Sequence, residues 1–184
     1  MSRLSPLDIE SLSPEMQQIV TQVTTDMGFT PNDMLIMARD PVLVGVLGQL
    51  VNVIYKPGGL SIELKKMVAL MSSSAAGCHY CQAHNMHGAR ETGITVEKLE
   101  SIWSYPDSDL FSDAEKAALD VARAASLTPN EVTDVMFDVL TEYFDEAQIV
   151  ELVAVVSLFG FLNRWNSTFK TEIEAVPAAS ALDV

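Results

Sequence analysis

Positively charged residues are scarce in this chain of 184 residues, which has 11 lysine and arginine side chains against 25 aspartate and glutamate side chains. The formal net charge at pH 7 is therefore −14. A surface this negative repels phosphate backbones and anionic lipid headgroups, because like charges oppose association. The composition argues against nucleic acid or a membrane surface as a partner, although it does not identify the partner.

The sequence also has little that would direct it to a membrane or out of the cell. Residues 1–14 contain no apolar segment of the kind found in secretory signals. The most hydrophobic stretch, residues 149–162, is interrupted by Glu151 and is shorter than the roughly 20 residues that cross a bilayer. We therefore expect a soluble protein of the cytoplasm, where thiols are kept reduced.

Alternating strand patterns are missing, and signals for helix starts are dense instead. Capping boxes begin at Ser112, Thr128 and Asp145, and Pro14 follows the capping residue Ser13. The expected helices cover residues 14–27, 42–55, 62–76, 78–92, 95–103, 113–126, 130–143 and 146–172. The sequence thus predicts an all-α fold in one all-helical domain, residues 1–184. Its parts are an N-terminal helical extension (1–39), a core with the cysteine pair (40–172) and a C-terminal tail (173–184).

Cysteine is nearly absent as well, and the two cysteines of the chain, Cys78 and Cys81, lie one helical turn apart. At this spacing on a helix, the two Cα atoms are about 5–6 Å apart, which suits a disulfide. His84 follows three residues later and projects from the same face. The pattern indicates a dithiol that takes part in redox chemistry rather than a structural bridge.

Three local features favour the reactive thiolate form of this pair. Gly77 places the cysteines at a helix N-terminus, where free N–H groups favour negative charge. His79 and His84 can supply positive charge or accept the thiol proton. The helix dipole favours Cys78 as the attacking sulfur, whereas proximity to His84 favours Cys81, so the assignment stays open. The competing interpretation is that two small apolar side chains fill a helix crossing.

A metal site is the next alternative, because Cys78, Cys81, His84 and His87 follow one another at intervals of three residues. On one continuous helix these four residues spread over about 14 Å of axis, so they do not surround one ion. We therefore expect neither a metal nor a cofactor.

Residues 67–72 resemble residues 152–157, which leaves open a degenerate internal repeat. The same register places Asn163 opposite Cys78, Asn166 opposite Cys81 and Trp165 opposite Tyr80. In a true repeat, the second copy has lost its thiols and serves as scaffold or pocket wall. Chance similarity between two buried apolar helices explains the six matching positions equally simply.

A helix rich in small and apolar residues, followed by Gly-Cys-His-Tyr-Cys and a nearby histidine, resembles the alkylhydroperoxidase D-like branch of the carboxymuconolactone decarboxylase family. Residues 163–166, Asn-Arg-Trp-Asn, resemble its peroxidase-related members. The resemblance covers about residues 40–172. It implies an all-α bundle that forms homo-oligomers, such as trimers or hexamers, and that reduces peroxides. It also implies that Cys81 is oxidised by the peroxide and that Cys78 resolves the product.

The chain departs from that branch at its proton relay. The branch places a glutamate twelve residues before the first cysteine, where this chain has Lys66, with Glu63 one turn earlier. The branch also has a histidine four residues after the second cysteine. This chain has Asn85 at that position, and its histidine, His84, is one residue earlier.

The sequence therefore predicts a cytoplasmic dithiol peroxidase that reduces a small hydroperoxide and is regenerated by a thiol or dithiol reductant. One alternative is a cofactor-free lyase like carboxymuconolactone decarboxylase, with His84 as the base and Arg90 or Arg164 as the anion-binding residue. The other is a non-enzymatic helical oligomer that senses oxidants. The candidate catalytic residues are Cys78, Cys81, His84 and Glu63, and the candidate pocket or tuning residues are Lys66, His79, Tyr80, Asn85 and Trp165.

Overall fold

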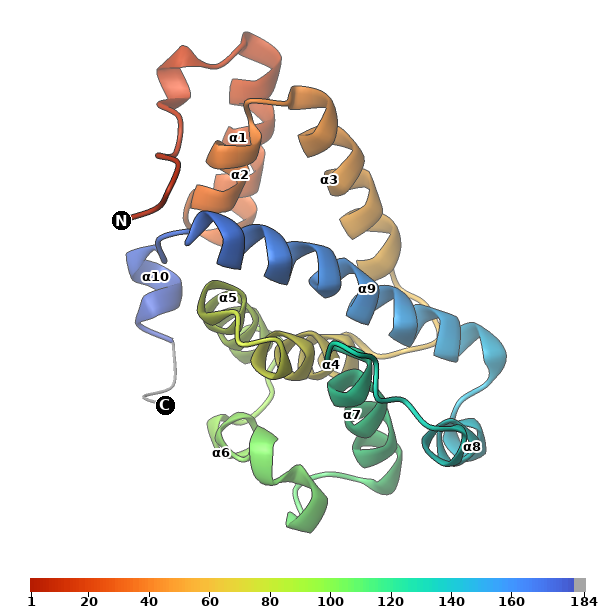
Figure 1. Ribbon diagram of the computed structural model, residues 1–184. Helices are drawn as coiled ribbons and strands as arrows, with labels where there is room; N and C mark the ends of the chain where they lie inside the picture. Colours follow the sequence, from red (N-terminus) through yellow and green to blue (C-terminus); the bar gives the residue numbers. More distant parts are fainter. Residues whose placement is uncertain (181–184) are drawn as a thin grey trace.

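In the computed structural model, which describes residues 1–180, helix α4 (Ile62–Ala75) lies at the centre of the molecule (Figure 1). It packs against α5 (His79–Arg90), α7 (Asp113–Ala125) and the long helix α9 (Glu146–Phe169). Within residues 1–180 the regular structure is helical throughout. The predicted all-α bundle is confirmed.

The remaining helices surround this centre. Their boundaries are Ile9–Ser11 (η1), Pro14–Met27 (α1), Asn32–Met37 (α2), Pro41–Tyr55 (α3), Val96–Glu100 (α6), Ile102–Asp107 (η2), Asp134–Tyr143 (α8) and Ala175–Ala178 (α10). The predicted capping side chains accept backbone N–H groups at the start of their helices, as Ser13 does for α1, Ser112 for α7 and Asp145 for α9. The starts of these helices are therefore fixed by local sequence.

The predicted helix start at Thr128 is wrong. Helix α8 begins at Asp134, and its capping side chain is Thr133, which accepts the N–H of Met136 at 3.2 Å. Upstream, the Asn130 side chain accepts the N–H of Val132 at 3.0 Å, which forms a turn instead of a helix. Side chains of this kind stabilise turns as readily as helix starts, so the motif alone did not decide between them.

Two apolar clusters hold the helices together. The main cluster includes Val68 and Met71 of α4 together with Leu152 and Val155 of α9, all fully buried. The second cluster lies between α1, α2 and α3, and Trp165 of α9 packs against it. Helix α9 thus joins the N-terminal helices to the centre of the bundle.

The apolar stretch of residues 149–162 is part of a longer helix. Helix α9 has 24 residues, and by length and composition it could span a bilayer. Past residue 162 the helix continues with mostly polar side chains, including Asn163, Arg164 and Asn166. A core helix passes the same test, and α9 packs against α4, α5 and α7.

The start of the chain fastens the segment that follows α9. The backbone N–H of Arg3 donates to the Phe169 carbonyl at 2.7 Å, and the N–H of Glu172 donates to the Ser2 hydroxyl at 2.9 Å. The Asn32 side chain of α2 donates to the Glu172 carbonyl at 2.9 Å. These bonds bring the start of the predicted C-terminal tail against α2 and α5. Residues 181–184 of that tail lie outside the described residues.

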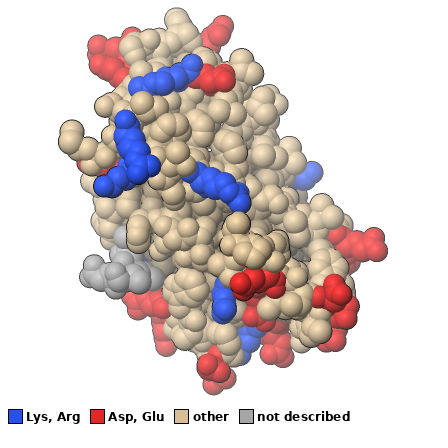
Figure 2. Space-filling model, in the orientation of Figure 1, with Lys and Arg blue, Asp and Glu red and all other residues tan. Residues whose placement is uncertain are grey.

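Charge is unevenly distributed over the face in Figure 2. Acidic side chains gather at the lower end of the molecule, where α6, α7 and α8 lie, and basic side chains lie mostly across the upper half.

Candidate active site

The two cysteines meet where α4 ends and α5 begins. Gly77 has a φ of 67°, in the left-handed region that glycine adopts without strain, and the chain turns sharply there. Cys78 then becomes the N-cap of α5, and its sulfur accepts the backbone N–H of Cys81 at 3.4 Å. The two sulfur atoms lie 2.8 Å apart, and both thiols are free. The side chains are buried, with exposed fractions of 1% for Cys78 and 3% for Cys81.

The surroundings of the two sulfurs push their acidities in opposite directions. The hydrogen bond with the Cys81 thiol lowers the pKa of Cys78, and the Cys81 backbone N–H and the Ser167 hydroxyl lower it further, against the effect of burial. Burial raises the pKa of Cys81, and its contact with Cys78 raises it further. Cys78 is the N-cap and Cys81 lies in the first turn of α5, and the opposite directions of their pKa shifts favour Cys78 as the more acidic thiol.

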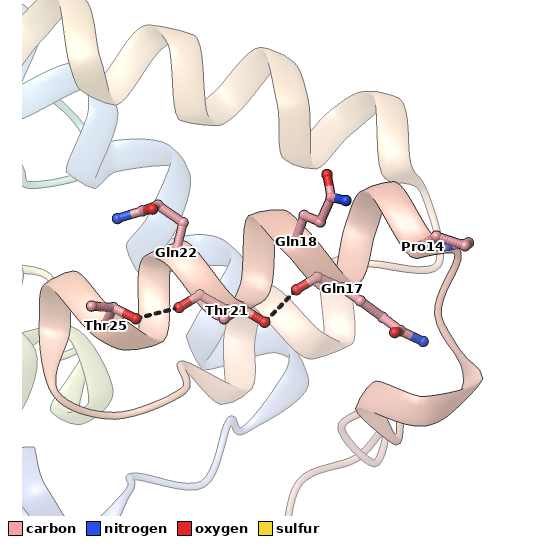
Figure 3. Close-up of a pocket in the computed structure, with 6 residues that line it drawn as sticks. All are labelled: Pro14, Gln17, Gln18, Thr21, Gln22 and Thr25. Carbon is pink, nitrogen blue, oxygen red and sulfur yellow. Dashed lines mark hydrogen bonds between the residues drawn. The ribbon is translucent and has the colours of Figure 1, made fainter.

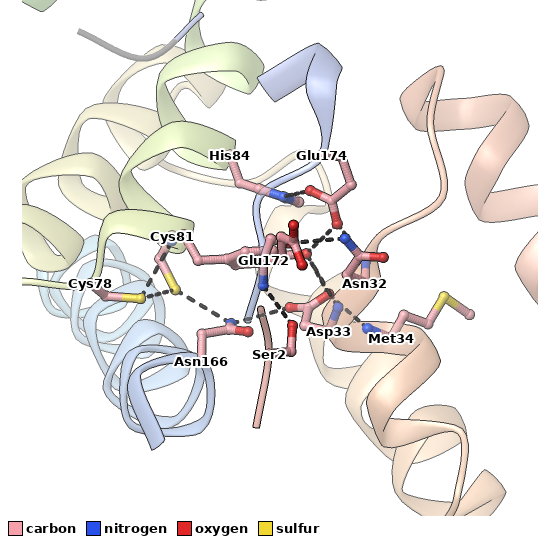
Figure 4. A network of polar contacts seen from close by, with 11 residues as sticks. Ser2, Asn32, Asp33, Met34, Cys78, Cys81, His84, Asn166, Glu172 and Glu174 are labelled. Atoms are coloured by element: carbon pink, nitrogen blue, oxygen red, sulfur yellow. Dashed lines mark hydrogen bonds and ion pairs between the residues drawn. The ribbon is translucent and has the colours of Figure 1, made fainter. Parts of the chain in front are cut away.

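A network of polar side chains begins at Cys81 (Figure 4). The Asn166 amide on α9 donates to Cys81 Sγ at 3.5 Å and to Asp33 Oδ2 at 3.2 Å. The Tyr80 hydroxyl lies 3.1 Å from Asp33 Oδ1 and 2.8 Å from Glu174 Oε1, with one proton to donate. Burial raises the pKa of Tyr80, and the two carboxylates raise it further, so its hydroxyl stays protonated.

The network ends at the pair formed by His84 and Glu174. His84 Nε2 lies 2.7 Å from Glu174 Oε2, and the His84 ring stacks on Tyr80 with the ring centres 4.1 Å apart. Burial raises the pKa of Glu174, but hydrogen bonds from His84 and from the Asn32 backbone N–H outweigh it and lower the pKa. The side chains are only 14% and 10% exposed, so this ion pair is sheltered from solvent. The arrangement holds protons on the Tyr80 hydroxyl and between His84 and Glu174, whereas the Asn166 amide, which donates to both Cys81 and Asp33, orients these groups without passing a proton.

The structure brings some of the predicted site residues together and separates others. Cys78, Cys81, Tyr80 and His84 belong to one connected cluster, in which His84 contacts the glutamate and not a sulfur. His79, the first residue of α5, is exposed. No contact between His79 and either sulfur occurs in the described part of the chain.

Lys66 and Glu63 lie away from the sulfurs. Lys66 Nζ sits 4.8 Å from the centre of the Tyr55 ring and beside Gly88, which is seven residues, or about 10 Å of helix axis, beyond Cys81. Burial lowers the pKa of Lys66. Glu63 precedes it by one turn of α4 and is therefore farther from the dithiol still. Neither residue occupies the place that the relay glutamate was expected to fill.

Asn85 and Trp165 have structural surroundings. The buried Asn85 amide donates to the Ala69 carbonyl at 3.3 Å and to the Ser73 hydroxyl at 3.0 Å, which ties α5 to α4. Trp165 stacks between Phe161 and Phe169, with ring centres 6.0 and 4.8 Å away. It belongs to the second apolar cluster rather than to a wall beside the sulfurs.

Sequence reasoning missed Asp33, Glu174 and Asn166. Asp33 and Glu174 are distant from the cysteines along the chain, and no local spacing marks them. Asn166 had one signal, because the register of the repeat placed it opposite Cys81, and its amide now contacts that sulfur. Within residues 1–180, no group of three His, Cys, Asp or Glu side chains is arranged to hold a metal ion.

A hollow of about 430 Å³ on the surface of α1 is not part of this site (Figure 3). Its lining comes from α1 alone and consists of one proline with glutamine and threonine side chains. None of these side chains titrates in the ordinary pH range, and no base lies among them to activate a threonine hydroxyl. The hollow therefore lacks the groups of a catalytic site.

Comparison with known proteins shows the family of the chain. The sequence model of the carboxymuconolactone decarboxylase family matches residues 44–137. The uncharacterized protein YnjA of Escherichia coli (strain K12) is 33% identical over 113 residues, which is 61% of this chain and 62% of YnjA.

Two solved structures extend the likeness over nearly the whole chain. The debrominase Bmp8 is 35% identical, with 96% of this chain and 94% of that chain covered and a TM-score of 0.88. A cysteine-to-alanine variant of Bmp8 in complex with 2,3,4-tribromopyrrole gives a TM-score of 0.89 over the same coverage. The alkylhydroperoxidase core of a peroxidase-related protein from Ralstonia eutropha JMP134 covers the same shares at 23% identity, with a TM-score of 0.85, which supports the fold alone.

Proposed function

This chain belongs to the carboxymuconolactone decarboxylase family, and we propose that it is a dithiol oxidoreductase that reduces a small hydroperoxide. The observation that supports the proposal is the pair of free sulfurs 2.8 Å apart, one of them capping a helix N-terminus. A thiolate in this position attacks an electrophilic atom, and its neighbour is close enough to displace the product without movement of the backbone. The protonated partner and the adjoining network supply the protons that this reaction needs.

The proposed reaction consumes two thiols for each hydroperoxide. One thiolate attacks the peroxide oxygen, the O–O bond breaks, and a sulfenic acid and an alcohol form. The second thiol attacks the sulfenic acid, a disulfide forms and water leaves. A thiol or dithiol reductant returns the enzyme to its starting state. We place this cycle in the cytoplasm, where such reductants are abundant.

Turnover with a defined substrate tests the proposal. The reduced protein is incubated with cumene hydroperoxide and dithiothreitol, and loss of peroxide is followed against a blank without protein. Without the reductant, we expect one equivalent of peroxide to be consumed and the intact mass to fall by about 2 Da, since disulfide formation removes two hydrogen atoms. Consumption no faster than in the blank, with an unchanged mass, would contradict the proposal.

Reductive debromination is a second candidate, favoured by the 35% identity to the debrominase over 96% of this chain. The same dithiol balances this reaction, in which a carbon–bromine bond is replaced by a carbon–hydrogen bond, bromide leaves and a disulfide forms. Incubation with 2,3,4-tribromopyrrole, the compound bound to the Bmp8 variant, distinguishes the candidates, because release of bromide without peroxide consumption would select debromination.

Glu174 is expected to support turnover by holding the His84 ring in place. Replacing Glu174 with glutamine removes the carboxylate that orients the His84 ring and should lower kcat about 10- to 100-fold, the usual effect of losing a residue that positions a functional histidine. The pH profile of kcat should also move, because the ionised carboxylate no longer acts on the ring. The measurement is kcat against pH with cumene hydroperoxide and dithiothreitol.

Glu172→Gln is the matched control, because Glu172 lies two residues earlier and is exposed. It should keep the kcat and the pH profile of the wild-type protein. Equal losses in both variants would mean that general disruption of the segment after α9, and not the His84–Glu174 pair, explains the result.

We further propose that the chain forms a homo-oligomer, such as a trimer or hexamer, through α3. Val42, Val46, Leu50 and Val53 follow one another at helical spacing on this helix and are 46–74% exposed. A row of apolar side chains of this kind is costly in water and is removed from it when two copies pack.

Replacing Val46 with glutamate should dissociate that oligomer, because a charge would be buried in the interface. Light scattering coupled to gel filtration measures the mass directly. Ile19→Glu on α1 is the control, since Ile19 is also exposed but lies outside α3. A wild-type protein with the mass of one chain would rule out the assembly.

A further inference from the structure

A cleft of about 640 Å³ lies near the start of α5, and its lining includes neither cysteine and none of the carboxylates of the network. It lies between α9, the C-terminal end of α4 and the segment that joins α7 to α8. Half of its lining residues are small or apolar, such as Ala76 and Val156, and the other half are polar, including the charged residue Arg164. A volume of this size accepts a compact organic molecule.

Two polar residues of the lining, Asn163 and Ser167, come from the last turns of α9. Ser167 lines the cleft, and its hydroxyl is close enough to Cys78 to lower the pKa of that thiol. Asn163 also lines it and is 4% exposed. Its amide nitrogen donates to the Ser72 carbonyl at 3.3 Å, whereas its oxygen has no partner among the described residues. An unpaired buried acceptor favours a ligand with an O–H or N–H group.

The two sulfurs therefore face different surroundings. Cys81 contacts Asn166 and, through it, the network that ends at His84. The hydroxyl of Ser167, an exposed residue that lines the cleft, lies beside Cys78. A substrate in the cleft consequently approaches Cys78 past Ser167, whereas Cys81 faces the polar network.

We propose that this cleft binds the substrate, a compact molecule with an O–H or N–H donor, and that Cys78 is the attacking sulfur. The inference rests on the proposed dithiol chemistry. It reverses the roles that the family resemblance implied, in which Cys81 attacks and Cys78 resolves. The shared substrate chemistry fits an organic hydroperoxide, through its O–H, and a halogenated pyrrole, through its N–H.

The steps for a hydroperoxide balance with the two thiols alone. The Cys78 thiolate attacks the outer peroxide oxygen, the O–O bond breaks, and the departing alkoxide takes the proton held by Cys81. The Cys81 thiolate then attacks the Cys78 sulfenic acid, and a disulfide forms. The hydroxide that leaves takes a proton from solvent and becomes water.

Thiol labelling tests the assignment without relying on turnover. The reduced full chain is treated with a limiting amount of N-phenylmaleimide, a compact apolar thiol reagent, and the label on each cysteine is quantified by peptide mass spectrometry. We expect Cys78 to be labelled at least tenfold faster than Cys81. Labelling of Cys81 first, or of both at equal rates, would overturn the assignment.

Filling the cleft tests the route to Cys78. Ser157→Trp places a large side chain in the cleft and should slow labelling of Cys78 by N-phenylmaleimide at least tenfold. Val150→Trp is the matched control, because Val150 is on the same helix, 68% exposed and outside the lining. If Ser157→Trp does not give the wild-type circular dichroism spectrum, Val153→Trp serves in its place. Wild-type labelling rates in a folded cleft variant would show that the cleft is not the route.

These outcomes separate the inference from the proposed function. Fast, cleft-dependent labelling of Cys78 without peroxide consumption would keep the cleft and reject the peroxidase. Peroxide turnover with preferential labelling of Cys81 would keep the peroxidase and reject the inference.

Discussion

Replacing Cys81 with serine should lower steady-state turnover by at least about 10³-fold, while one equivalent of hydroperoxide is still consumed. Cys78 remains able to attack, but its sulfenic acid has no neighbouring thiol to resolve it, because serine does not form a disulfide. The variant should therefore gain about 16 Da, the mass of one oxygen atom, instead of losing two hydrogen atoms. Intact mass spectrometry after a single addition of cumene hydroperoxide measures this difference.

Cys78→Ser provides the comparison, since it removes the sulfur at the helix N-terminus and leaves the buried Cys81 thiol. Burial raises the pKa of Cys81, so this variant should neither turn over nor form the sulfenic acid at an appreciable rate. Formation of the oxygen adduct in Cys78→Ser but not in Cys81→Ser would exchange the two roles. Unchanged turnover in both variants would reject the dithiol mechanism.

Replacing Glu151 with glutamine should lower the free energy of unfolding by about 3 kcal/mol, a typical effect of removing one partner of a buried ion pair. Lys65 is 2% exposed, and its ammonium group lies 3.0 Å from Glu151 Oε2. The ammonium group also donates to the carbonyls of Ile54 and Lys56, at 2.9 and 3.1 Å. The variant leaves this buried positive charge without its counter-charge. Urea unfolding followed by circular dichroism measures the change.

The same carboxylate predicts how stability depends on pH. Hydrogen bonds from the Gly59 backbone N–H and from Lys65, with a further one from the Leu60 N–H, lower the pKa of Glu151 to about 2. Because the folded pKa lies below the unfolded value of about 4.3, the contribution is complete above that value. It is lost as the pH falls towards 2. The wild-type protein should lose stability over this range more steeply than Glu151→Gln does.

Glu142→Gln is the control for both measurements, since Glu142 is an exposed glutamate on α8. It should keep the wild-type free energy of unfolding within about 0.5 kcal/mol, the usual range for surface substitutions. A Glu151→Gln variant that matches Glu142→Gln would show that the Lys65–Glu151 pair does not stabilise the fold.

Much of the fold was predictable because helix boundaries depend on neighbouring residues. Gly77, with its positive φ, and the capping side chains of Ser61 and Asp145 act within three residues of their own position. The failure at Thr128 shows the limit of this rule. A capping motif stabilises a helix start only where the following segment packs as a helix, and packing is not a local property.

The candidate site divides in the same way. The closeness of Cys78 and Cys81 follows from helical spacing alone. The network beyond Cys81 depends on residues distant in sequence, with separations of 47 residues for Tyr80 and Asp33 and 94 for Tyr80 and Glu174. The family pattern suggested a glutamate on α4, whereas the carboxylate beside His84 comes from the segment after α9. Hydrogen bonds that join Ser2 and Arg3 to residues 169–172 hold that segment beside His84.

The sequence by itself determined that the chain is helical, where most helices begin, and that two thiols lie within reach of each other. Each of these follows from interactions over three or four residues, which helix geometry repeats in every protein. Only the tertiary structure decided which carboxylates surround Tyr80 and His84, that Lys66 lies away from the sulfurs, and that a cleft lies beside Cys78. Those contacts join separate elements, and they form only when the apolar faces of α4, α5 and α9 pack together.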